Sequence, residues 1–263
     1  MIHIFGGTSD ARLICQLLDR AGEGYSVSVA SEAGRQLAEG ILGQIVVGRM
    51  DSGEMAHYLQ QHGIHWVIDA SHPYANALSE NVIAACHRQK IRLTRYQRPS
   101  DIERLSHPLL HKVNSVEEAC RLAQTLGPKV LLTTGSKQLA EYQSALRGKK
   151  LLVRVLPTAE VLMQCEALGL GVDNIIALRG PFSASLNRAL YETYQPDVVI
   201  TKESGNQGGY LQKVEPCLAL RIPCIVVRRP TPLAAERWDE QVSSLDAFAQ
   251  LLSLWQNQRG KTR

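Results

Sequence analysis

Two loops of this sequence hold residue types that bind and protonate small ligands. Gly6-Gly7-Thr8 follows a short apolar run at the N-terminus, and Ser71-His72 follows another apolar run. Each loop is predicted to connect a buried strand to a helix. The first N–H groups of a helix have no partner within it, so anionic ligands gather at this edge of a parallel sheet. The sequence therefore favours a small-molecule enzyme with an anionic cofactor.

The first loop has some features of a phosphate-binding turn and lacks others. Gly6-Gly7 allows positive φ and close backbone approach, Thr8 can cap the next helix, and Arg12 can add a charged contact. However, Thr8 and Ala11 stand where G-x-G-x-x-G has its second and third glycines, and Asp10 would repel a phosphate. A tight strand-to-helix turn would also explain the glycine pair. This loop alone identifies no ligand.

The end of the second predicted strand normally selects the dinucleotide. An acidic residue there binds the ribose diol of NAD, whereas Arg or Ser accommodates the extra phosphate of NADP. The sequence has Ser31, Glu32 and Arg35 together at this point. The choice between NADPH and NADH therefore stays open.

The loop around His72 combines an acid, a hydroxyl and an imidazole. His72 could donate a proton or, when charged, bind a substrate carboxylate. Asp69 could equally be a turn or capping residue. A Ser-His-Asp hydrolase is excluded, because a triad assembles from separate loops around a nucleophile elbow and the sequence has no G-x-S-x-G.

Cations follow several other predicted strands. Arg95 and Arg98 flank an aromatic residue and suit a flat ligand with carboxylates, although they could simply cover a domain junction. Thr134-Gly135-Ser136-Lys137 lacks the first glycine of a phosphate loop, which argues against an NTPase. Arg179-Gly180-Pro181 and Lys202–Gly209 repeat the combination of glycine and cation. Turn chemistry explains each loop singly, but coincidence is a poor explanation for the whole set.

Apolar runs rich in β-branched residues alternate with stretches of helical period. Strands are expected at Ile2–Phe5, Tyr25–Ala30, Gln44–Val47, Trp66–Ala70, Ile91–Tyr96, Leu109–Val113, Val130–Thr133, Leu151–Val155, Ile175–Leu178, Val198–Thr201 and Ile225–Val227. A closing amphipathic helix is expected at Ser244–Trp255. Such alternation predicts an α/β fold with mainly parallel sheets, because parallel strands need helical crossovers.

A polar, proline-containing stretch after Arg98 interrupts this rhythm, and we place a domain boundary there. We expect two Rossmann-like domains, 1–105 and 106–263, with a cleft between them.

Composition limits the class of protein. The chain has 263 residues, 44% of them hydrophobic, and a formal net charge of +4, too mild to predict nucleic-acid binding. No apolar run could span a bilayer and no targeting segment is visible, so we expect a cytoplasmic protein, a monomer or weak homo-oligomer. The six cysteines are scattered and predicted to be buried thiols. His57, His62 and His65 lack Cys or Asp at ligand spacing, so no metal site is expected.

Together the loops resemble the precorrin-6A reductase family of cobalamin (vitamin B12) biosynthesis. The likeness extends from residue 2 to about residue 230, and the set of motifs in this order is specific. The motifs are Gly6-Gly7-Thr8 with Arg12, Asp69-Ala70-Ser71-His72-Pro73-Tyr74-Ala75, Arg98-Pro99, Thr134-Gly135-Ser136-Lys137, Arg179-Gly180-Pro181-Phe182, and Thr201-Lys202 with Ser204-Gly205 and Gly208-Gly209.

The resemblance implies a nicotinamide cofactor, NADPH or NADH, whose hydride reduces a ring double bond of precorrin-6A to give precorrin-6B. Members of the oxygen-independent branch act on the cobalt-containing substrate, and overall likeness favours that branch. The cobalt would belong to the tetrapyrrole substrate. Such a macrocycle carries many carboxylates, so cations and a wide groove suit it better than elaborate acid–base machinery.

The site residues are assigned on this basis. The cofactor residues are Gly7, Thr8, Arg12, Ser31, Ser136, Lys137, Arg179, Lys202 and Ser204, of which the last five could contact either ligand. The substrate residues are Ser71, Tyr74, Arg95 and Arg98, and His72 is the candidate catalytic proton donor. The alternatives are another Rossmann-like enzyme, such as a methyltransferase or a sugar-nucleotide enzyme, and a non-catalytic tetrapyrrole- or nucleotide-binding protein.

Overall fold

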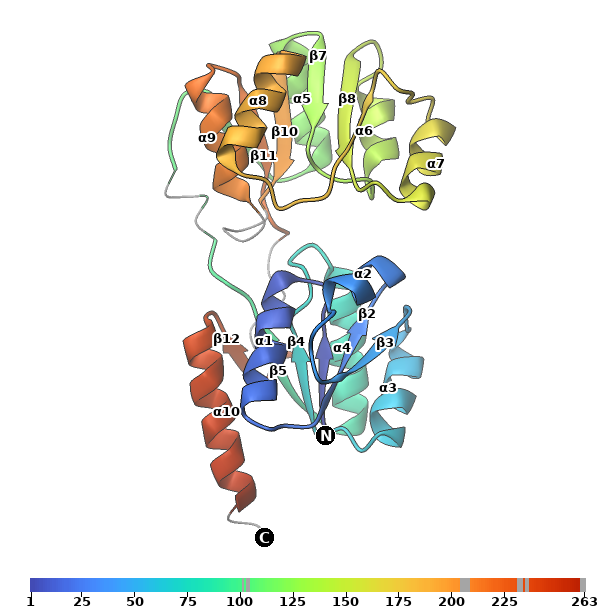
Figure 1. Cartoon of the computed structure of the whole chain (residues 1–263), viewed down its shortest axis with the longest axis vertical. Coiled ribbons are helices and arrows are strands. Elements are labelled where there is room, and N and C mark those ends of the chain that lie inside the picture. The colour runs from blue at the N-terminus through green and yellow to red at the C-terminus, as the bar shows by residue number, and fades with distance from the viewer. Residues whose placement is uncertain (101, 103–104, 204–208, 231–233, 235–236, 261–263) are drawn as a thin grey trace. The chain divides into compact units, whose positions relative to one another are not determined.

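The computed structural model describes the whole chain except residues 101, 103–104, 204–208, 231–233, 235–236 and 261–263. The chain divides into two compact units. Unit 1 comprises Met1–Pro99 and Pro230–Arg263, and unit 2 comprises Ser100–Arg229. Figure 1 shows each unit as a sheet with helices on both of its faces. The predicted α/β fold with Rossmann-like parallel sheets is confirmed.

Unit 1 contains a six-stranded sheet in the order β12-β5-β4-β1-β2-β3, with every pair parallel. Its strands are β1 (Ile2–Phe5), β2 (Tyr25–Val29), β3 (Gln44–Val47), β4 (Trp66–Asp69), β5 (Arg92–Tyr96) and β12 (Glu240–Val242). Its helices are α1 (Ser9–Arg20), α2 (Glu32–Leu37), α3 (Ser52–Gln61), α4 (Asn76–Gln89) and α10 (Leu245–Gly260). The order reverses between β1 and β4.

The C-terminal segment belongs to unit 1, which corrects the predicted domain 106–263. β12 pairs with β5, and the carboxylate of Glu240 lies 2.6 Å from the Arg92 guanidinium. On α10, Phe248 and Trp255 pack against Trp66 with ring centroids 6.0 and 4.9 Å away. The sequence did not predict β12, because this strand is three residues long and mostly polar.

Unit 2 contains a second six-stranded parallel sheet in the order β6-β11-β10-β7-β8-β9. Its strands are β6 (Leu110–Val113), β7 (Lys129–Leu132), β8 (Lys150–Val155), β9 (Ile175–Ala177), β10 (Val198–Lys202) and β11 (Cys224–Val227). Its helices are α5 (Val116–Leu126), α6 (Leu139–Ala145), α7 (Ala159–Ala167), α8 (Ala184–Tyr194) and α9 (Tyr210–Ala219). This order reverses between β7 and β10.

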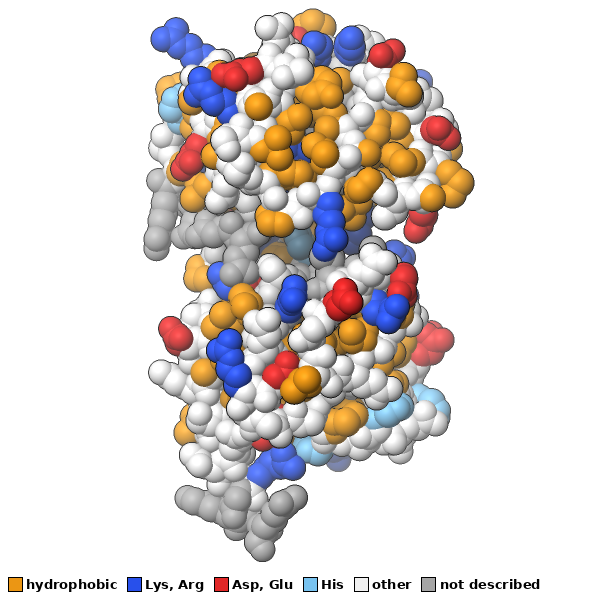
Figure 2. All heavy atoms as spheres, in the orientation of Figure 1, with side chains coloured by type: hydrophobic (Ala, Val, Ile, Leu, Met, Phe, Trp, Pro, Cys, Tyr) orange, Lys and Arg blue, Asp and Glu red, His pale blue; other side chains and the backbone are white. Residues whose placement is uncertain are grey.

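Each sheet is buried on both faces. In unit 1, α1 and α10 cover one face and α3 and α4 the other, and in unit 2 α8 and α9 lie opposite α5, α6 and α7. All six cysteines are buried free thiols that form no disulfide bond, as predicted. On the face seen in Figure 2, acidic and basic side chains are interspersed, in keeping with the small net charge. None of the described helices has the length and hydropathy needed to cross a membrane.

Candidate functional site

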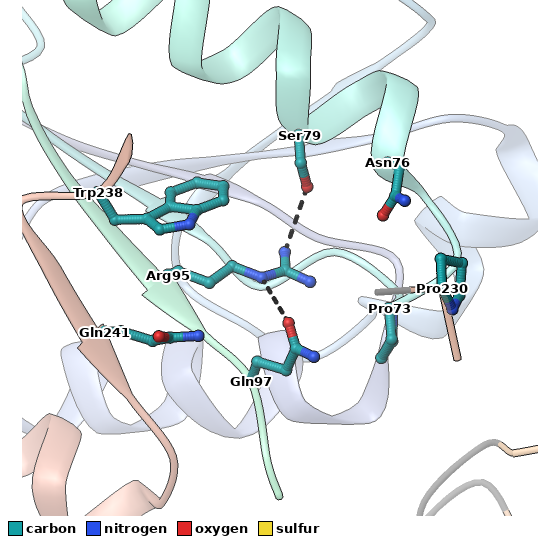
Figure 3. A pocket seen from close by; sticks show the side chains of 8 residues that line it. All are labelled: Pro73, Asn76, Ser79, Arg95, Gln97, Pro230, Trp238 and Gln241. Carbon is teal, nitrogen blue, oxygen red and sulfur yellow. Dashed lines mark hydrogen bonds between the residues drawn. The ribbon is translucent and has the colours of Figure 1, made fainter. Parts of the chain in front are cut away.

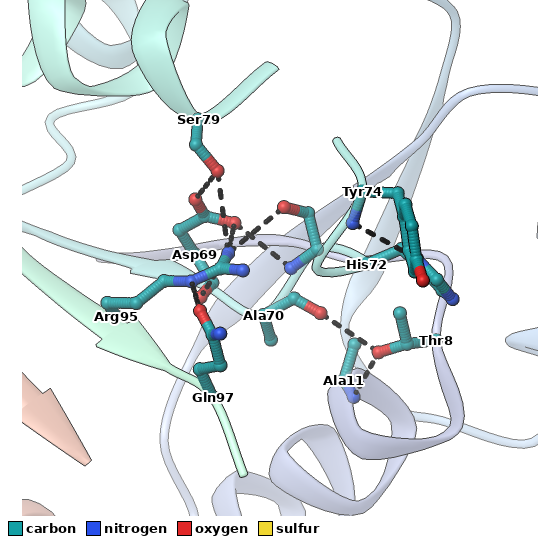
Figure 4. Close-up of polar contacts among 10 residues, drawn as sticks. Thr8, Ala11, Asp69, Ala70, His72, Tyr74, Ser79, Arg95 and Gln97 are labelled. Carbon is teal, nitrogen blue, oxygen red and sulfur yellow. Dashed lines mark hydrogen bonds and ion pairs between the residues drawn. The ribbon is translucent and has the colours of Figure 1, made fainter. Parts of the chain in front are cut away.

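The site in unit 1 begins where the sheet order reverses. In open α/β sheets, ligands bind outside the carboxyl ends of the strands at this point, because neighbouring crossovers leave in opposite directions. Thr8 links the two loops that follow β1 and β4 at this point. Its hydroxyl donates to the carbonyl of Ala70 at 2.9 Å and accepts the N–H of Ala11 at 3.0 Å (Figure 4). Thr8 is thereby the N-cap of α1 and fixes the loop after β1 against the loop after β4.

The two glycines of the first loop have different physical roles. A Cβ on Gly6 would lie 2.9 Å from Cγ2 of Val27, so only glycine permits this close packing against β2. Gly7 has a φ of +91° and open space where a side chain would stand. The backbone at Gly7 is therefore accessible to a ligand, and a residue with a side chain would be strained there.

A shallow pocket opens beside this loop. Its wall includes Gly7, Thr8 and Arg12, and it extends past the end of β2 to Gly34 on α2. Arg12 donates one hydrogen bond, to the carbonyl of Glu39 at 3.1 Å. Ser31 caps α2 by accepting the N–H of Gly34. Gly7, Thr8 and Arg12, three of the predicted cofactor residues, thus line one pocket. Ser31, another of them, caps α2, which borders that pocket.

Asp69 and Arg95 form a buried ion pair behind the β4 loop. Their closest N–O distance is 2.7 Å, and they are 0% and 4% exposed. The Asp69 carboxylate also accepts the N–H of Ser71 at 3.0 Å and the hydroxyl of Ser79 at 2.6 Å (Figure 4). Asp69 is therefore a turn residue that holds the loop. The charge of Arg95, predicted to bind a substrate carboxylate, is already balanced within the protein.

A second pocket lies next to Arg95 (Figure 3). Arg95 is stacked over Trp238 at 5.8 Å and donates to Gln97 at 3.3 Å. Asn76 and Gln241 complete much of the lining. Sequence analysis missed Trp238 and Gln241, because nothing local to the C-terminal segment indicates that it returns to unit 1.

Arg98 compensates the negative charge of Asp10, which would otherwise repel a phosphate at this loop. The Arg98 guanidinium lies 2.8 Å from the Asp10 carboxylate, and its Nε donates to the hydroxyl of Tyr96 at 3.3 Å. Asp10 stands in the first turn of α1 and would repel an incoming phosphate. The ion pair compensates that charge. Arg98, predicted to contact substrate, is thus placed at the N-terminus of α1.

His72 and Tyr74 lie on the outer part of the β4 loop. The His72 imidazole is exposed, and its Nδ1 accepts the N–H of Tyr74 at 3.3 Å. This bond assigns the proton of the neutral ring to Nε2. The rings of His72 and Tyr74 are 5.4 Å apart. Nε2 therefore carries the proton of the neutral ring, and the role of proton donor, which stays a prediction, requires the ring to be protonated on both nitrogens.

The predicted cations of unit 2 divide into two groups. Lys202, at the end of β10, donates to Gln138 at 2.6 Å, and its pKa is lowered by burial and then by the nearby Lys137. Lys137 is exposed and Ser136 is half-buried in the adjoining loop after β7. Lys202, Ser136 and Lys137 thus surround the reversal point of the second sheet.

The other predicted residues of unit 2 are placed differently. Arg179 follows the edge strand β9, which β8 separates from β7, so it stands apart from the reversal point. Its side chain is exposed. Ser204 lies outside the described residues. Within the described part of the chain, no cluster of His, Cys, Asp or Glu could hold a metal ion.

Comparison with known proteins shows the family of this chain. The sequence matches the family described as precorrin-6x reductase CbiJ/CobK over residues 1–253. It is 52% identical to a cobalt-precorrin-6A reductase of Salmonella typhimurium, covering 97% of this chain and 96% of the relative. A cobalt-precorrin-6A reductase of Priestia megaterium is 34% identical, covering 88% and 91% of the two chains.

The chain belongs to the precorrin-6x reductase family. The resemblance seen in the loops is thereby confirmed. A solved structure of CobK precorrin-6A reductase has a TM-score of 0.77 and 22% identity, covering 96% of both chains, and so shares the fold. Family membership gives no role to individual residues, and the site assignments remain predictions.

Proposed function

We propose that this protein reduces a ring double bond of cobalt-precorrin-6A, with hydride from a nicotinamide dinucleotide bound to unit 1. The observation that carries the proposal is the Gly7-Thr8 turn, which opens into a pocket at the reversal point of a sheet. The chain that bears this turn is 52% identical, over nearly its full length, to a protein named cobalt-precorrin-6A reductase.

The residues at the turn fit a dinucleotide. A pyrophosphate needs a helix N-terminus, a backbone that it can approach and no uncompensated negative charge nearby. Gly7 leaves the space of a side chain empty, Thr8 caps α1, and Arg98 pairs with Asp10. Each requirement thus has a residue that meets it, even though the glycine fingerprint is incomplete.

The roles in cofactor binding follow from these positions. The backbone at Gly7 and Thr8 binds the pyrophosphate, and Arg12 adds a charged donor from the pocket wall. Ser31, at the start of α2, contacts the adenosine ribose or its 2′-phosphate. When bound, the reduced nicotinamide supplies the hydride.

The β4 loop serves the substrate. Reduction of a carbon–carbon double bond adds a hydride to one carbon and a proton to the other. In its charged, imidazolium form the exposed His72 ring supplies that proton, and the contact between Nδ1 and the N–H of Tyr74 belongs to the neutral ring. Ser71 and Tyr74 position the macrocycle. Arg95 acts through the loop that it holds, and Arg98 keeps Asp10 neutralised.

Unit 2 supplies further positive charge. Lys137 and Lys202 flank the reversal point of its sheet, with Ser136 beside them. Ser136, Lys137, Lys202, Arg179 and Ser204 are proposed to contact phosphate or carboxylate groups of the bound ligands. A polyanionic macrocycle and a dinucleotide both require such compensation.

Fluorescence titration with NADPH, NADH and S-adenosylmethionine tests the function and selects the dinucleotide. Micromolar binding of NADPH or NADH, with none of S-adenosylmethionine, is expected. The reduced-nicotinamide absorbance should then fall only when cobalt-precorrin-6A is added. Binding of S-adenosylmethionine alone would identify a methyltransferase. Binding of the corrinoid without any loss of absorbance would identify a carrier.

A further inference from the structure

A row of polar residues crosses the sheet of unit 2 beneath α8 and α9. Ile200 on β10 is opposite Leu132 on β7, which is opposite Val153 on β8. One residue further along each strand stand Thr201, Thr133 and Arg154. Side chains alternate across a sheet, so these three share the face covered by α8 and α9, about 10 Å from one end of the row to the other.

Arg154 is buried in this row without an acidic partner. It is 6% exposed, its guanidinium donates to the amide oxygen of Asn187 at 2.6 Å, and it lies 4.2 Å from the ring centroid of Phe182. Both partners are neutral. Among the described residues no carboxylate forms an ion pair with Arg154. A buried charge without a counter-ion is costly, so such a charge normally has a partner.

A second cation stands on α9, one of the two helices that cover the row. Lys213 is partly buried, and its pKa is lowered to about 8, first by burial and then by Arg154. Its backbone carbonyl accepts the hydroxyl of Tyr191 at 3.1 Å, which fixes α9 against α8. The thiol of Cys217, one turn further along α9, is also buried and its sulfur donates to the same carbonyl. In the described part of the chain, Lys213 has no ion pair either.

Polar atoms of this layer also lack hydrogen bonds. Thr201 is 0% exposed, and its hydroxyl has no partner among the described residues. The side-chain oxygen of Gln212, beside Lys213, is likewise buried without a donor in that part of the structure. By contrast, the hydroxyl of Thr133 donates to the carbonyl of Ile200 at 3.2 Å. Buried polar groups are nearly always paired, so these orphans indicate a missing ligand.

We propose that Arg154, Lys213 and Thr201 form an oxyanion subsite of unit 2, which binds a carboxylate or a phosphate group. Two cations and a hydroxyl supply donors of the kind that such a group accepts, and the anion would compensate both charges at once. The assignment of a biological ligand rests on the proposed function. The anion is then either a side-chain carboxylate of the corrinoid or a phosphate of the dinucleotide.

Inorganic phosphate and glutarate are suitable probes of the subsite. At constant ionic strength, with chloride as the reference, one or both should raise the Tm of the protein. The part of the rise that the subsite contributes should be lost in Lys213→Met and kept in Lys213→Arg. The Arg12→Ala variant, which alters the phosphate-binding pocket proposed for unit 1, should keep the part that depends on Lys213. The proposal is overturned if neither anion stabilises the wild type, or if Lys213→Met responds as the wild type does.

Two hydroxyl variants provide a matched pair that does not depend on Lys213. Thr201→Val should leave the Tm of the ligand-free protein unchanged, because the hydroxyl has no bond to lose, and should reduce the anion-induced rise. Thr133→Val should lower the Tm of the ligand-free protein, because it loses a buried hydrogen bond. A loss of stability in Thr201→Val with an undiminished anion response would contradict the subsite.

Kinetics distinguishes the two sources of the anion. If the dinucleotide supplies it, Lys213→Met should raise the KM for the dinucleotide roughly tenfold and leave that for the corrinoid unchanged. If the corrinoid supplies it, Lys213→Met should raise the KM for the corrinoid roughly tenfold and leave that for the dinucleotide unchanged. Unchanged values of both, without an anion-induced rise in Tm, would remove the subsite while the reductase stands. Anion binding that depends on Lys213, without any reduction, would remove the reductase while the subsite stands.

Discussion

The guanidinium of Arg98 lies 2.8 Å from the carboxylate of Asp10, and this pair joins the end of β5 to the first turn of α1. The pair is partly exposed, so its direct contribution to stability is small. Its importance is electrostatic. An acidic side chain at a phosphate-binding helix terminus is tolerable only when a cation accompanies it.

The first prediction concerns this pair. Arg98→Met should raise the KM for the dinucleotide by up to about fivefold, because it leaves Asp10 uncompensated; that corresponds to about 1 kcal/mol. Adding Asp10→Asn should restore most of the loss, because the repulsive charge is then gone too. Steady-state kinetics of the two single variants and the double variant measures the coupling. A double variant as impaired as Arg98→Met would show that Asp10 does not face the cofactor.

Arg12 provides a second test of the cofactor pocket. Arg12→Ala should weaken dinucleotide binding by about 1.5–3 kcal/mol, the range for a hydrogen bond to a charged group. Arg20→Ala is the matched control, because Arg20 is an exposed residue in the last turn of the same helix. Fluorescence titration measures both. Equal affinities of the two variants would remove Arg12 from the site.

The third prediction separates chemistry from binding at His72. His72→Asn should lower kcat by about 10²–10⁴-fold, the usual contribution of a general acid, and leave the Kd of the dinucleotide unchanged. His87→Asn, which alters an exposed histidine on α4, should have the kinetics of the wild type. Wild-type turnover by His72→Asn would leave His72 at most a positioning residue.

Asp69 and Arg95 should matter chiefly for the stability of unit 1. Asp69→Asn or Arg95→Met leaves one charge buried without its partner, and each should lower the free energy of unfolding by about 3–5 kcal/mol. The double variant should recover part of this loss. All three tryptophans belong to unit 1, so their fluorescence during urea unfolding follows this unit. A double variant less stable than both single variants would contradict a simple ion pair.

The fifth prediction concerns the buried imidazole of His3. Its two nitrogens lie 2.7 and 2.9 Å from the hydroxyls of Ser26 and Ser28. Burial, with a smaller effect of His62, lowers the pKa of His3 from 6.5 to about 3. Between these pH values the unfolded chain binds a proton that the folded protein does not. The free energy of unfolding should therefore fall by about 1.4 kcal/mol for each pH unit below 6.5.

Urea unfolding followed by tryptophan fluorescence at several pH values measures this slope. His3→Gln removes the titrating group and should flatten the dependence between pH 6.5 and 4 relative to the wild type. The same slope in both proteins would show that other groups account for the acid sensitivity of unit 1.

The sequence by itself determined the parallel sheets and their loops. Runs such as Trp66–Ile68 and Val198–Ile200 are apolar and rich in β-branched residues, and stretches of helical period separate such runs. These are local patterns, whereas the strand order and its reversal points come from the structure. The glycines and hydroxyls at the strand ends could therefore be named as candidate site residues before the fold was known.

Only the tertiary structure decided which partner each of these residues has. Arg95 was expected to bind substrate, yet Asp69, on the neighbouring strand, balances its charge. Glu240–Val242 carries too little apolar pattern to predict a strand, and it becomes one because β5 offers an open edge and Arg92 a charge. Ion pairs and strand pairing between distant segments depend on how the chain closes in space, and local sequence patterns do not encode that closure.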